Sequence, residues 1–201
     1  MPDDHALPRP IDARRQRKQA NRDAMVDAAA ELFASVGYAA TTMDAVAAGS
    51  DMSVQSVYFA FHSKANLLRA ALERLTPPPS PRPTGTDPDQ ALVLLVENAV
   101  RSLEATGPLV LAAAAAAPGD PAVEEVRAIH EGQRAQAAAD LVHHLRSRRP
   151  MAPGVKARRV VDVVYGLLSP QLYAMLVQER GWTPKRYAGW CADATGRALW
   201  G

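Results

Sequence analysis

The chain has 201 residues, of which 48% are hydrophobic and 22% charged, and its formal net charge is only +2. This composition can bury one large or two small cores, and it excludes an intrinsically disordered chain. The single cysteine, Cys191, excludes a disulfide scaffold and is typical of a reducing compartment. No apolar run approaches the length of a membrane span, and the N-terminus lacks the apolar core of a secretory signal. We therefore expect a cytoplasmic globular protein with no membrane contact.

The basic charge of the N-terminal third is concentrated at its beginning. Residues 9–22 include six basic residues and one acid, whereas residues 23–74 include three basic residues and six acids. A cationic arm over residues 1–20 is therefore a candidate contact for a polyanion such as DNA. The alternative is a solvated, mobile tail.

The first block, residues 21–75, has the apolar spacing of helices. A long first helix is indicated by apolar residues at helical spacing and by the glycine that ends it: Met25, Ala29, Leu32, Phe33, Val36 and Gly37. Hydroxyl side chains at Thr41–Thr42, Ser53 and Ser63 are suited to cap three further helices. We expect a three-helix helix-turn-helix domain followed by a fourth helix.

A proline-rich segment separates this block from the rest of the chain. Six prolines between residues 77 and 88 exclude a helix there. Residues 76–90 are expected to form either an extended, semi-rigid linker or an ordered surface loop.

The second block, residues 91–201, is again helical in its apolar spacing. Breaks are expected at Gly107–Pro108 and at Pro118–Gly119, and Pro170 is expected to kink the apolar helix that contains it. Thr183–Pro184 is suited to start the last helix. No stretch alternates with the period of a strand, so the predicted fold class is all-α.

The second and third predicted helices are joined by a tight turn at Gly49–Met52 and make a helix-turn-helix. In that geometry the start of the later helix reaches base edges in the major groove. The residues at that start are Val54, Gln55 and Ser56. Glutamine can pair with adenine, and valine can pack against a thymine methyl group. Thr42 and Lys64 stand at the starts of the flanking helices, where free backbone N–H groups favour phosphates.

Four motifs of the first block stand in a characteristic order and spacing: Ala28–Tyr38, Thr41–Asp44, Ser53 and Tyr58–Lys64. Together, from Asn21 to Leu72, they resemble the DNA-binding domain of TetR-type transcriptional regulators. The C-terminal half is only loosely similar, in Ser169–Tyr173 and Arg180–Tyr187. The resemblance implies a one-component repressor: a homodimer that binds an inverted-repeat operator and is released by a small ligand in its C-terminal domain.

The resemblance also implies a set of DNA contacts. The residues concerned are Thr42, Ser53, Val54, Gln55, Ser56, Tyr58, Phe59 and Lys64. Thr42 and Lys64 would contact phosphates, the start of the third helix would face the bases, and the two rings would lie against the DNA backbone. Ser53 would act first as a helix cap and second as a phosphate contact.

Two positions depart from the family's pattern. Ala60 stands where the family usually has histidine, so one backbone contact is missing. Asp51 stands at the glycine of the turn, and aspartate tolerates a left-handed conformation, so the turn is expected to survive. With the acidic bias of residues 23–74, these losses suggest weaker nonspecific affinity, which the basic arm would offset.

The C-terminal half is a candidate for a ligand cavity between helices. The candidate lining residues are polar or aromatic positions on apolar faces: His130, Gln133, Tyr165 and Tyr173. The alternative for each is a satisfied core or surface residue.

The last two predicted helices carry many large apolar side chains: Leu172, Met175, Leu176, Trp190 and Leu199. The resemblance implies that these helices pair with their copies in a four-helix dimer interface, and paired half-sites on DNA require such two-fold symmetry. Cys191 is expected near this interface as a packing residue rather than a redox switch.

Enzyme sites have little support in the sequence. Asp140 and His143 lie one turn apart, but a di-iron bundle needs further carboxylates, and His143–His144 lacks a third ligand at metal spacing. There is no glycine-rich phosphate loop and no nucleophile elbow, so we expect no enzyme and no cofactor. The alternative function is a helical small-molecule-binding or enzymatic bundle whose helix-turn-helix no longer binds an operator. A third hypothesis is a DNA-binding regulator that senses no ligand and is controlled by a partner.

Overall fold

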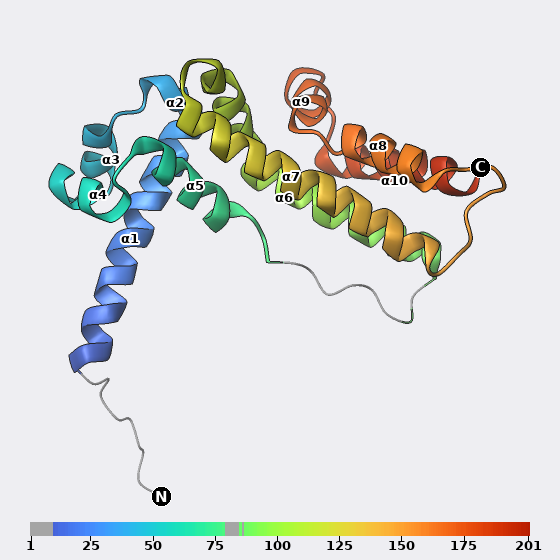
Figure 1. The fold of residues 1–201 in the computed structure, drawn as a ribbon, viewed down its shortest axis with the longest axis horizontal. Coiled ribbons are helices and arrows are strands. Elements are labelled where there is room, and N and C mark those ends of the chain that lie inside the picture. The colour runs from blue at the N-terminus through green and yellow to red at the C-terminus, as the bar shows by residue number, and fades with distance from the viewer. Residues whose placement is uncertain (1–9, 79–84, 86) are drawn as a thin grey trace, which may run out of the picture. The chain divides into compact units, whose positions relative to one another are not determined.

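The computed structural model describes residues 10–78, 85 and 87–201, with side chains from Ala13 onward. Every regular element in these residues is helical (Figure 1), which confirms the all-α fold class. The beginning of the expected arm and residues 79–84 and 86 of the proline-rich segment lie outside the described residues. The chain divides into an N-terminal unit that ends at Ala71 and a C-terminal unit that begins at Leu72.

The N-terminal unit is built from one long helix followed by short ones. These are α1 (Pro10–Ser35), α2 (Gly37–Ala40), α3 (Met43–Gly49), α4 (Val54–Phe61) and α5 (Lys64–Leu75), the last of which runs across the division between the units. The predicted caps are confirmed, because the hydroxyl oxygens of Thr42, Ser53 and Ser63 accept hydrogen bonds from backbone N–H groups at 3.1–3.2 Å. The four-residue α2 was not predicted, because so short a helix shows no period.

The expected basic arm is helical from Pro10 onward, because α1 begins there rather than near residue 21. Proline fits the first position of a helix, and the following arginines, glutamines, lysine and alanines are good helix formers. The side chains of residues 13–20 are exposed, so this extension presents its charges to solvent.

Buried side chains from α1 to α5 meet in the core of the N-terminal unit. The large ones are Phe33, Tyr38, Val46, Val57, Phe61 and Leu68. The rings of Phe33 and Tyr38 stack with their centroids 5.5 Å apart, which joins α1 to α2. This packing fixes α3 and α4 against the rest of the unit.

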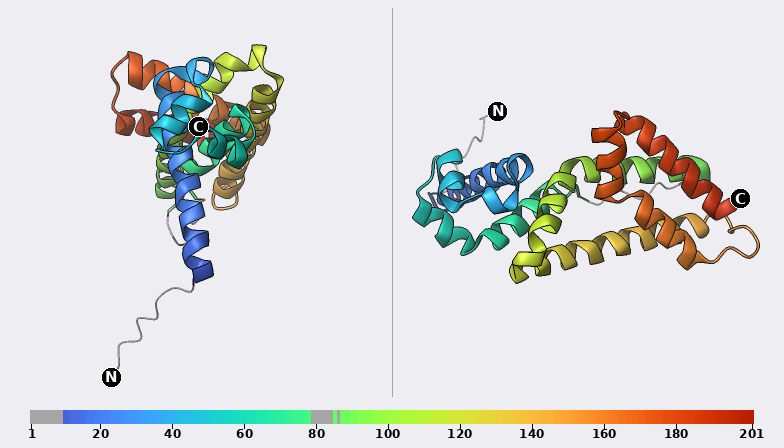
Figure 2. Two further views of the ribbon diagram at one scale, coloured as in Figure 1. Left: turned by 90° about the vertical axis from the view of Figure 1, so that its left-hand side faces the viewer. Right: turned by 90° about the horizontal axis from the view of Figure 1, so that it is seen from above.

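The C-terminal unit is a helical bundle. Its elements are α6 (Pro88–Ala116), the 3-10 turn η1 (Ala117–Gly119), α7 (Pro121–Arg146), α8 (Ala157–Leu167), α9 (Pro170–Tyr173), the π-helical η2 (Ala174–Glu179) and α10 (Pro184–Trp200). α6 packs against α7 and α10, and α8 packs against the same two helices (Figures 1 and 2). The core between these helices includes Val96, Leu103, Leu145, Val164, Tyr187, Cys191 and Leu199.

The prediction of a break at Gly107–Pro108 is wrong, because α6 continues through Pro108 to Ala116. Proline removes one backbone hydrogen bond and costs a helix about 3 kcal/mol. Leu109 and Val110 are buried directly after it, and burying two such side chains contributes about 3–6 kcal/mol. Core packing therefore outweighs the local signal. The expected break at Pro118–Gly119 is confirmed, as the turn η1.

Pro170 ends a helix instead of kinking one. α8 stops at Leu167, Ser169 caps the next element by accepting from Leu172 N at 3.2 Å, and Pro170 occupies the first position of α9. The segments on either side of this break are bent by 46°. Among the described residues no single helix is long and apolar enough to cross a membrane. In the same part of the chain, only this bent pair of segments, taken together, has the length and composition of a membrane span.

All three tryptophans of the chain lie close to its C-terminal end. The rings of Trp182 and Trp190 meet edge to face with centroids 5.8 Å apart. The guanidinium of Arg149 lies over the ring of Trp200 at 4.6 Å, and that of Arg186 lies over Trp182 at 4.0 Å.

Candidate nucleic-acid interface and ligand cavity

The turn between α3 and α4 is closed by local hydrogen bonds. Met52 N donates to Ala47 O at 2.9 Å, and the buried Ser50 hydroxyl donates to Val46 O at 2.8 Å. Asp51 adopts a φ of +56°, so the left-handed conformation predicted for this residue is confirmed. The departure from glycine therefore leaves a helix-turn-helix intact.

α4 buries one side and exposes the other. Val57 and Phe61 face the core, whereas Gln55 is exposed, Tyr58 is 50% exposed and Phe59 is 77% exposed. Val54 and Ser56 are half-buried at the start of the helix, and Ser53 is exposed as its cap. The structure thus brings the predicted base-facing and ring residues onto one short, accessible helix.

A groove of about 870 Å³ runs between α1 and α4 within the N-terminal unit. Its α1 wall includes Arg15, Lys18 and Arg22, and its α4 wall includes Gln55, Ser56 and Phe59. The sequence did not predict this α1 wall, because its basic residues were assigned to a cationic arm outside the helical domain. Their spacing along the sequence, at helical intervals over two turns, was the available signal.

Two basic side chains that are candidates for DNA contact, Lys64 and Arg22, donate hydrogen bonds within the N-terminal unit. Lys64 Nζ donates to the carbonyls of Tyr38 and Thr41 at 2.8 and 2.9 Å and lies 4.3 Å from the centroid of the Tyr38 ring. Arg22 Nη1 donates to Ala60 O at 2.9 Å, at the end of α4. Both side chains therefore position elements of the unit. Thr42 remains exposed as the cap of α3.

A cavity of about 140 Å³ lies between α6, α7 and α8 in the C-terminal unit. Of the four predicted lining residues, His130 and Tyr165 contribute to its wall. Gln133 is exposed elsewhere on α7. Tyr173 is buried against Tyr187, with ring centroids 5.1 Å apart, and burial, aided by Glu104, raises its pKa to about 12.

The cavity wall also contains a charged network that the sequence did not reveal. Arg134 pairs with Glu131 at 2.8 Å and donates to the carbonyls of Tyr165 and Leu168 at 3.3 and 3.1 Å. The Tyr165 hydroxyl donates to Glu131. Burial alone would raise the pKa of Glu131, but the hydrogen bonds and charge of these partners outweigh it and lower that pKa. The network ties α7 to the end of α8.

The residues predicted for a dimer interface are not all at the surface. Met175 is 44% exposed, and Leu172, Leu176 and Trp190 are half-buried. The prediction for Leu199 is wrong, because its side chain is fully buried in the core of its own unit.

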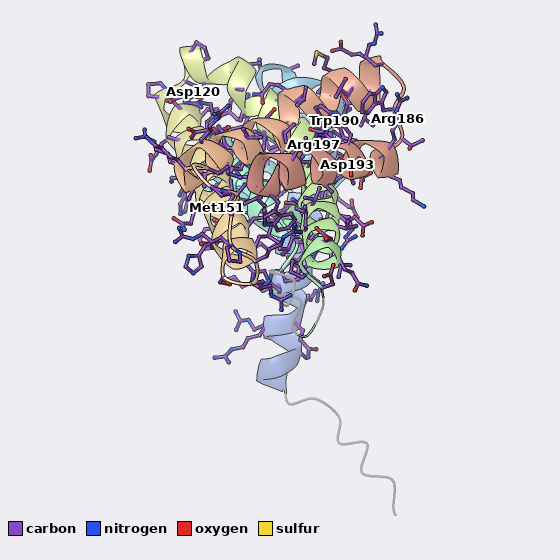
Figure 3. The ribbon with its side chains drawn as sticks, turned by 90° about the vertical axis from the view of Figure 1, so that its right-hand side faces the viewer. Asp120, Met151, Arg186, Trp190, Asp193 and Arg197 are labelled. Carbon is purple, nitrogen blue, oxygen red and sulfur yellow. The ribbon has the colours of Figure 1, made fainter. Side chains whose placement is uncertain are left out.

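The outer side of α10 carries mostly charged residues. Arg186, Trp190, Asp193 and Arg197 follow one another along it (Figure 3). Cys191 lies on the opposite, buried side, where burial raises the pKa of its thiol to about 12. A thiol so held is unreactive, in keeping with a packing role.

A family model described as bacterial regulatory proteins, tetR family, matches residues 25–71, from α1 to α5. None of the curated proteins matches the chain.

Solved structures share the fold over nearly the whole chain. NalD of Pseudomonas aeruginosa, the secondary repressor of the MexAB-OprM multidrug efflux pump, is 22% identical, with a TM-score of 0.69 over 90% of this chain and 98% of its own. A Rhodococcus sp. protein provisionally assigned as a TetR-family transcriptional regulator is 16% identical, with a TM-score of 0.69 over 90% and 99%. FadR of Bacillus subtilis, solved with stearoyl-CoA, is 11% identical, with a TM-score of 0.65 over 88% and 98%.

The intact turn, the exposed face of α4 and the helical bundle define a helix-turn-helix unit followed by a helical C-terminal unit. Residues 25–71 of the N-terminal unit match the model of the tetR family of bacterial regulatory proteins, and the fold of the chain is shared with solved structures that include NalD.

Proposed function

We propose that the chain is a cytoplasmic, homodimeric repressor that binds an inverted-repeat operator and is released by a small ligand held in its C-terminal unit. The observation that carries the proposal is the exposed face of α4 beside the cationic wall of α1. A helix of this kind enters the major groove, and neighbouring cations neutralise phosphates. NalD, which shares the fold, is a repressor, and this supports repression rather than activation.

The DNA contacts follow from the exposure of each group. Gln55 reads a base edge, Tyr58 and Phe59 pack against the sugar-phosphate backbone, and Thr42 and Ser53 offer hydroxyl groups at helix starts. Arg15 and Lys18 on α1 neutralise phosphates that run along the groove.

A homodimer forms through the outer side of α10 and the neighbouring Leu172, Met175 and Leu176. Arg186, Asp193 and Arg197 supply charges of both signs on this face, which favours contact with a second, two-fold related copy. Such symmetry places two copies of α4 on two half-sites.

The test is a selection of bound fragments from the source genome with the purified full-length protein at physiological salt. The expected result is a pseudo-palindrome whose half-sites lie about one helical turn apart. A folded dimer that enriches no motif would contradict the proposal and favour the alternative, a ligand-binding bundle with a degenerate helix-turn-helix.

Two alanine variants separate base reading from phosphate contact. Gln55→Ala is expected to lose about 1–3 kcal/mol of preference at one base pair. Arg15→Ala, its control on the opposite wall of the groove, should weaken binding to all sequences alike and reduce the slope against salt by about 1. Fluorescence anisotropy with cognate and scrambled duplexes measures both effects, and equal behaviour of the two variants on every sequence would refute the assignment.

A further inference from the structure

The cavity between α6, α7 and α8 has the size of one aromatic ring. Its volume is about 140 Å³, and most of its wall is apolar: Ala99, Leu103, Ala137, Ala138, Leu141 and Leu168. An engineered apolar cavity of about 150 Å³ holds a benzene molecule. The space therefore accommodates one six-membered ring.

Two polar groups of the wall are available to a ligand. In the part of the chain that the structure describes, the His130 imidazole and the Ser102 hydroxyl line the cavity, and neither makes a hydrogen bond with another residue. Burial lowers the pKa of His130, and Arg134 acts in the same direction. The imidazole is consequently neutral near pH 7, with one donor and one acceptor nitrogen.

The charged groups beside the cavity are already paired. The Arg134 guanidinium is held by Glu131 and by the carbonyls of Tyr165 and Leu168, so it has a counter-charge and a full set of neighbours. A charged ligand would lose its hydration without gaining an unpaired opposite charge, which is unfavourable. The wall therefore selects for a neutral molecule.

We propose that this cavity is a site for a neutral monocyclic phenol, whose ring packs among the alanines and leucines and whose hydroxyl bonds to His130 and Ser102. The regulatory part of this inference rests on the proposed function, in which a small ligand releases the operator. The cavity then defines the chemical class of that ligand. The ligand lies beside Arg134, which holds the last carbonyls of α8. Its binding thereby acts on the junction between α8 and α9.

The binding test is an NMR titration of the full-length protein with phenol as the probe, following the imidazole nitrogens of ¹⁵N-labelled histidines. The His130 resonance, assigned with His130→Gln, is expected to shift on addition of phenol. Phenol should bind about fivefold more tightly than toluene, which lacks the hydroxyl. Benzoate, which is charged, should leave the resonance unmoved. Tighter binding of benzoate than of phenol would overturn the proposal.

Matched variants locate the site. Ala99→Leu fills the cavity and is expected to reduce phenol affinity at least tenfold, whereas Ala135→Leu, the same change at an exposed position of α7 outside the wall, should not. Ala137→Leu narrows the cavity from a more exposed wall position. It replaces Ala99→Leu in this test if Ala99→Leu does not fold. His130→Phe should abolish the preference for phenol over toluene. Unchanged phenol affinity in folded Ala99→Leu or Ala137→Leu protein would place the ligand elsewhere and contradict the proposal.

Operator release is measured separately, by anisotropy of a bound duplex during phenol addition. Release by phenol supports the site and its regulatory role. Phenol binding without release supports the site and contradicts its role in the proposed function. Phenol binding by a protein that recognises no operator likewise supports the site, while the proposed function fails.

Discussion

The Lys64 side chain makes structural contacts within the N-terminal unit. Its ammonium group donates to three carbonyls where α2 leads into α3, and it lies over the Tyr38 ring. The phosphate contact implied by family resemblance would therefore come from a side chain that also positions the helix-turn-helix. Asp51 makes a similar point, since it replaces a glycine and yet keeps the left-handed turn.

Lys64→Ala is expected to lower the free energy of unfolding by about 1–2 kcal/mol, because part-buried carbonyl oxygens lose their donor. Urea unfolding followed by far-UV circular dichroism measures this loss. Lys18→Ala, which removes an exposed cation from α1, is the control and should leave stability unchanged. Equal stability of Lys64→Ala and wild type would show that the carbonyl contacts contribute nothing.

At the scale of the element, α7 contains two Glu–Arg pairs of the same spacing in different surroundings. Glu124 and Arg127 pair at 2.6 Å on the exposed first turns, whereas Glu131 and Arg134 pair at 2.8 Å beside the cavity with side chains only 21% and 13% exposed. The second pair also bonds to the end of α8. Only the second pair joins two helices, so it should matter more to stability.

Glu131→Gln is expected to destabilise the protein by about 1–2 kcal/mol at pH 7, after allowance for solvent screening, because Arg134 loses its counter-charge. The pKa of Glu131 is lowered in the folded state, so its contribution is present above the ordinary value of 4.5 and is lost as pH falls through the folded pKa. Thermal unfolding between pH 3 and 7 checks this. Glu124→Gln is the matched control, and a loss as large in that variant would contradict the argument.

Local chemistry made much of the fold predictable from the sequence. Thr42, Ser53 and Thr183 cap helices because a hydroxyl next to free N–H groups depends only on neighbouring residues. Pro108 was misjudged because its helix is maintained by core packing, which no local window contains. The end of α8 was missed for a similar reason, since its carbonyls are held by a residue more than thirty positions away.

The candidate sites were predictable to different degrees. Exposure of Gln55 and Phe59 follows from the phase of α4, which Val57 and Phe61 fix. On α7 the phase was ambiguous, so His130 and Gln133, three residues apart, were both proposed although only the first lines the cavity. The sequence did not predict a role for Arg134, because its partners Tyr165 and Leu168 become neighbours only when α7 and α8 pack.

At the scale of the whole molecule, the proposed dimer forms through a face of α10 that carries charges of both signs. In the proposed dimer, antiparallel pairing of α10 with its copy would place Asp193 opposite arginines of the second copy. Among the described residues, Asp193 and Arg197 form no ion pair within the chain.

Asp193→Lys is expected to weaken dimerisation about tenfold or more, because it leaves only like charges on this face. Sedimentation velocity over a concentration series measures the effect. Glu125→Lys makes the same change of charge at an exposed position of α7 and should leave the association constant unaltered. A monomeric wild-type protein, or equal effects of both variants, would remove α10 from the interface.

The clustering of all three tryptophans near the C-terminal end makes the two units optically distinct. Trp182, Trp190 and Trp200 belong to the C-terminal unit, and the N-terminal unit contains none. Intrinsic emission excited near 295 nm therefore reports on the C-terminal unit alone. A change in that emission when a duplex binds to α4 would be a signal transmitted from one unit to the other, observed without any attached dye.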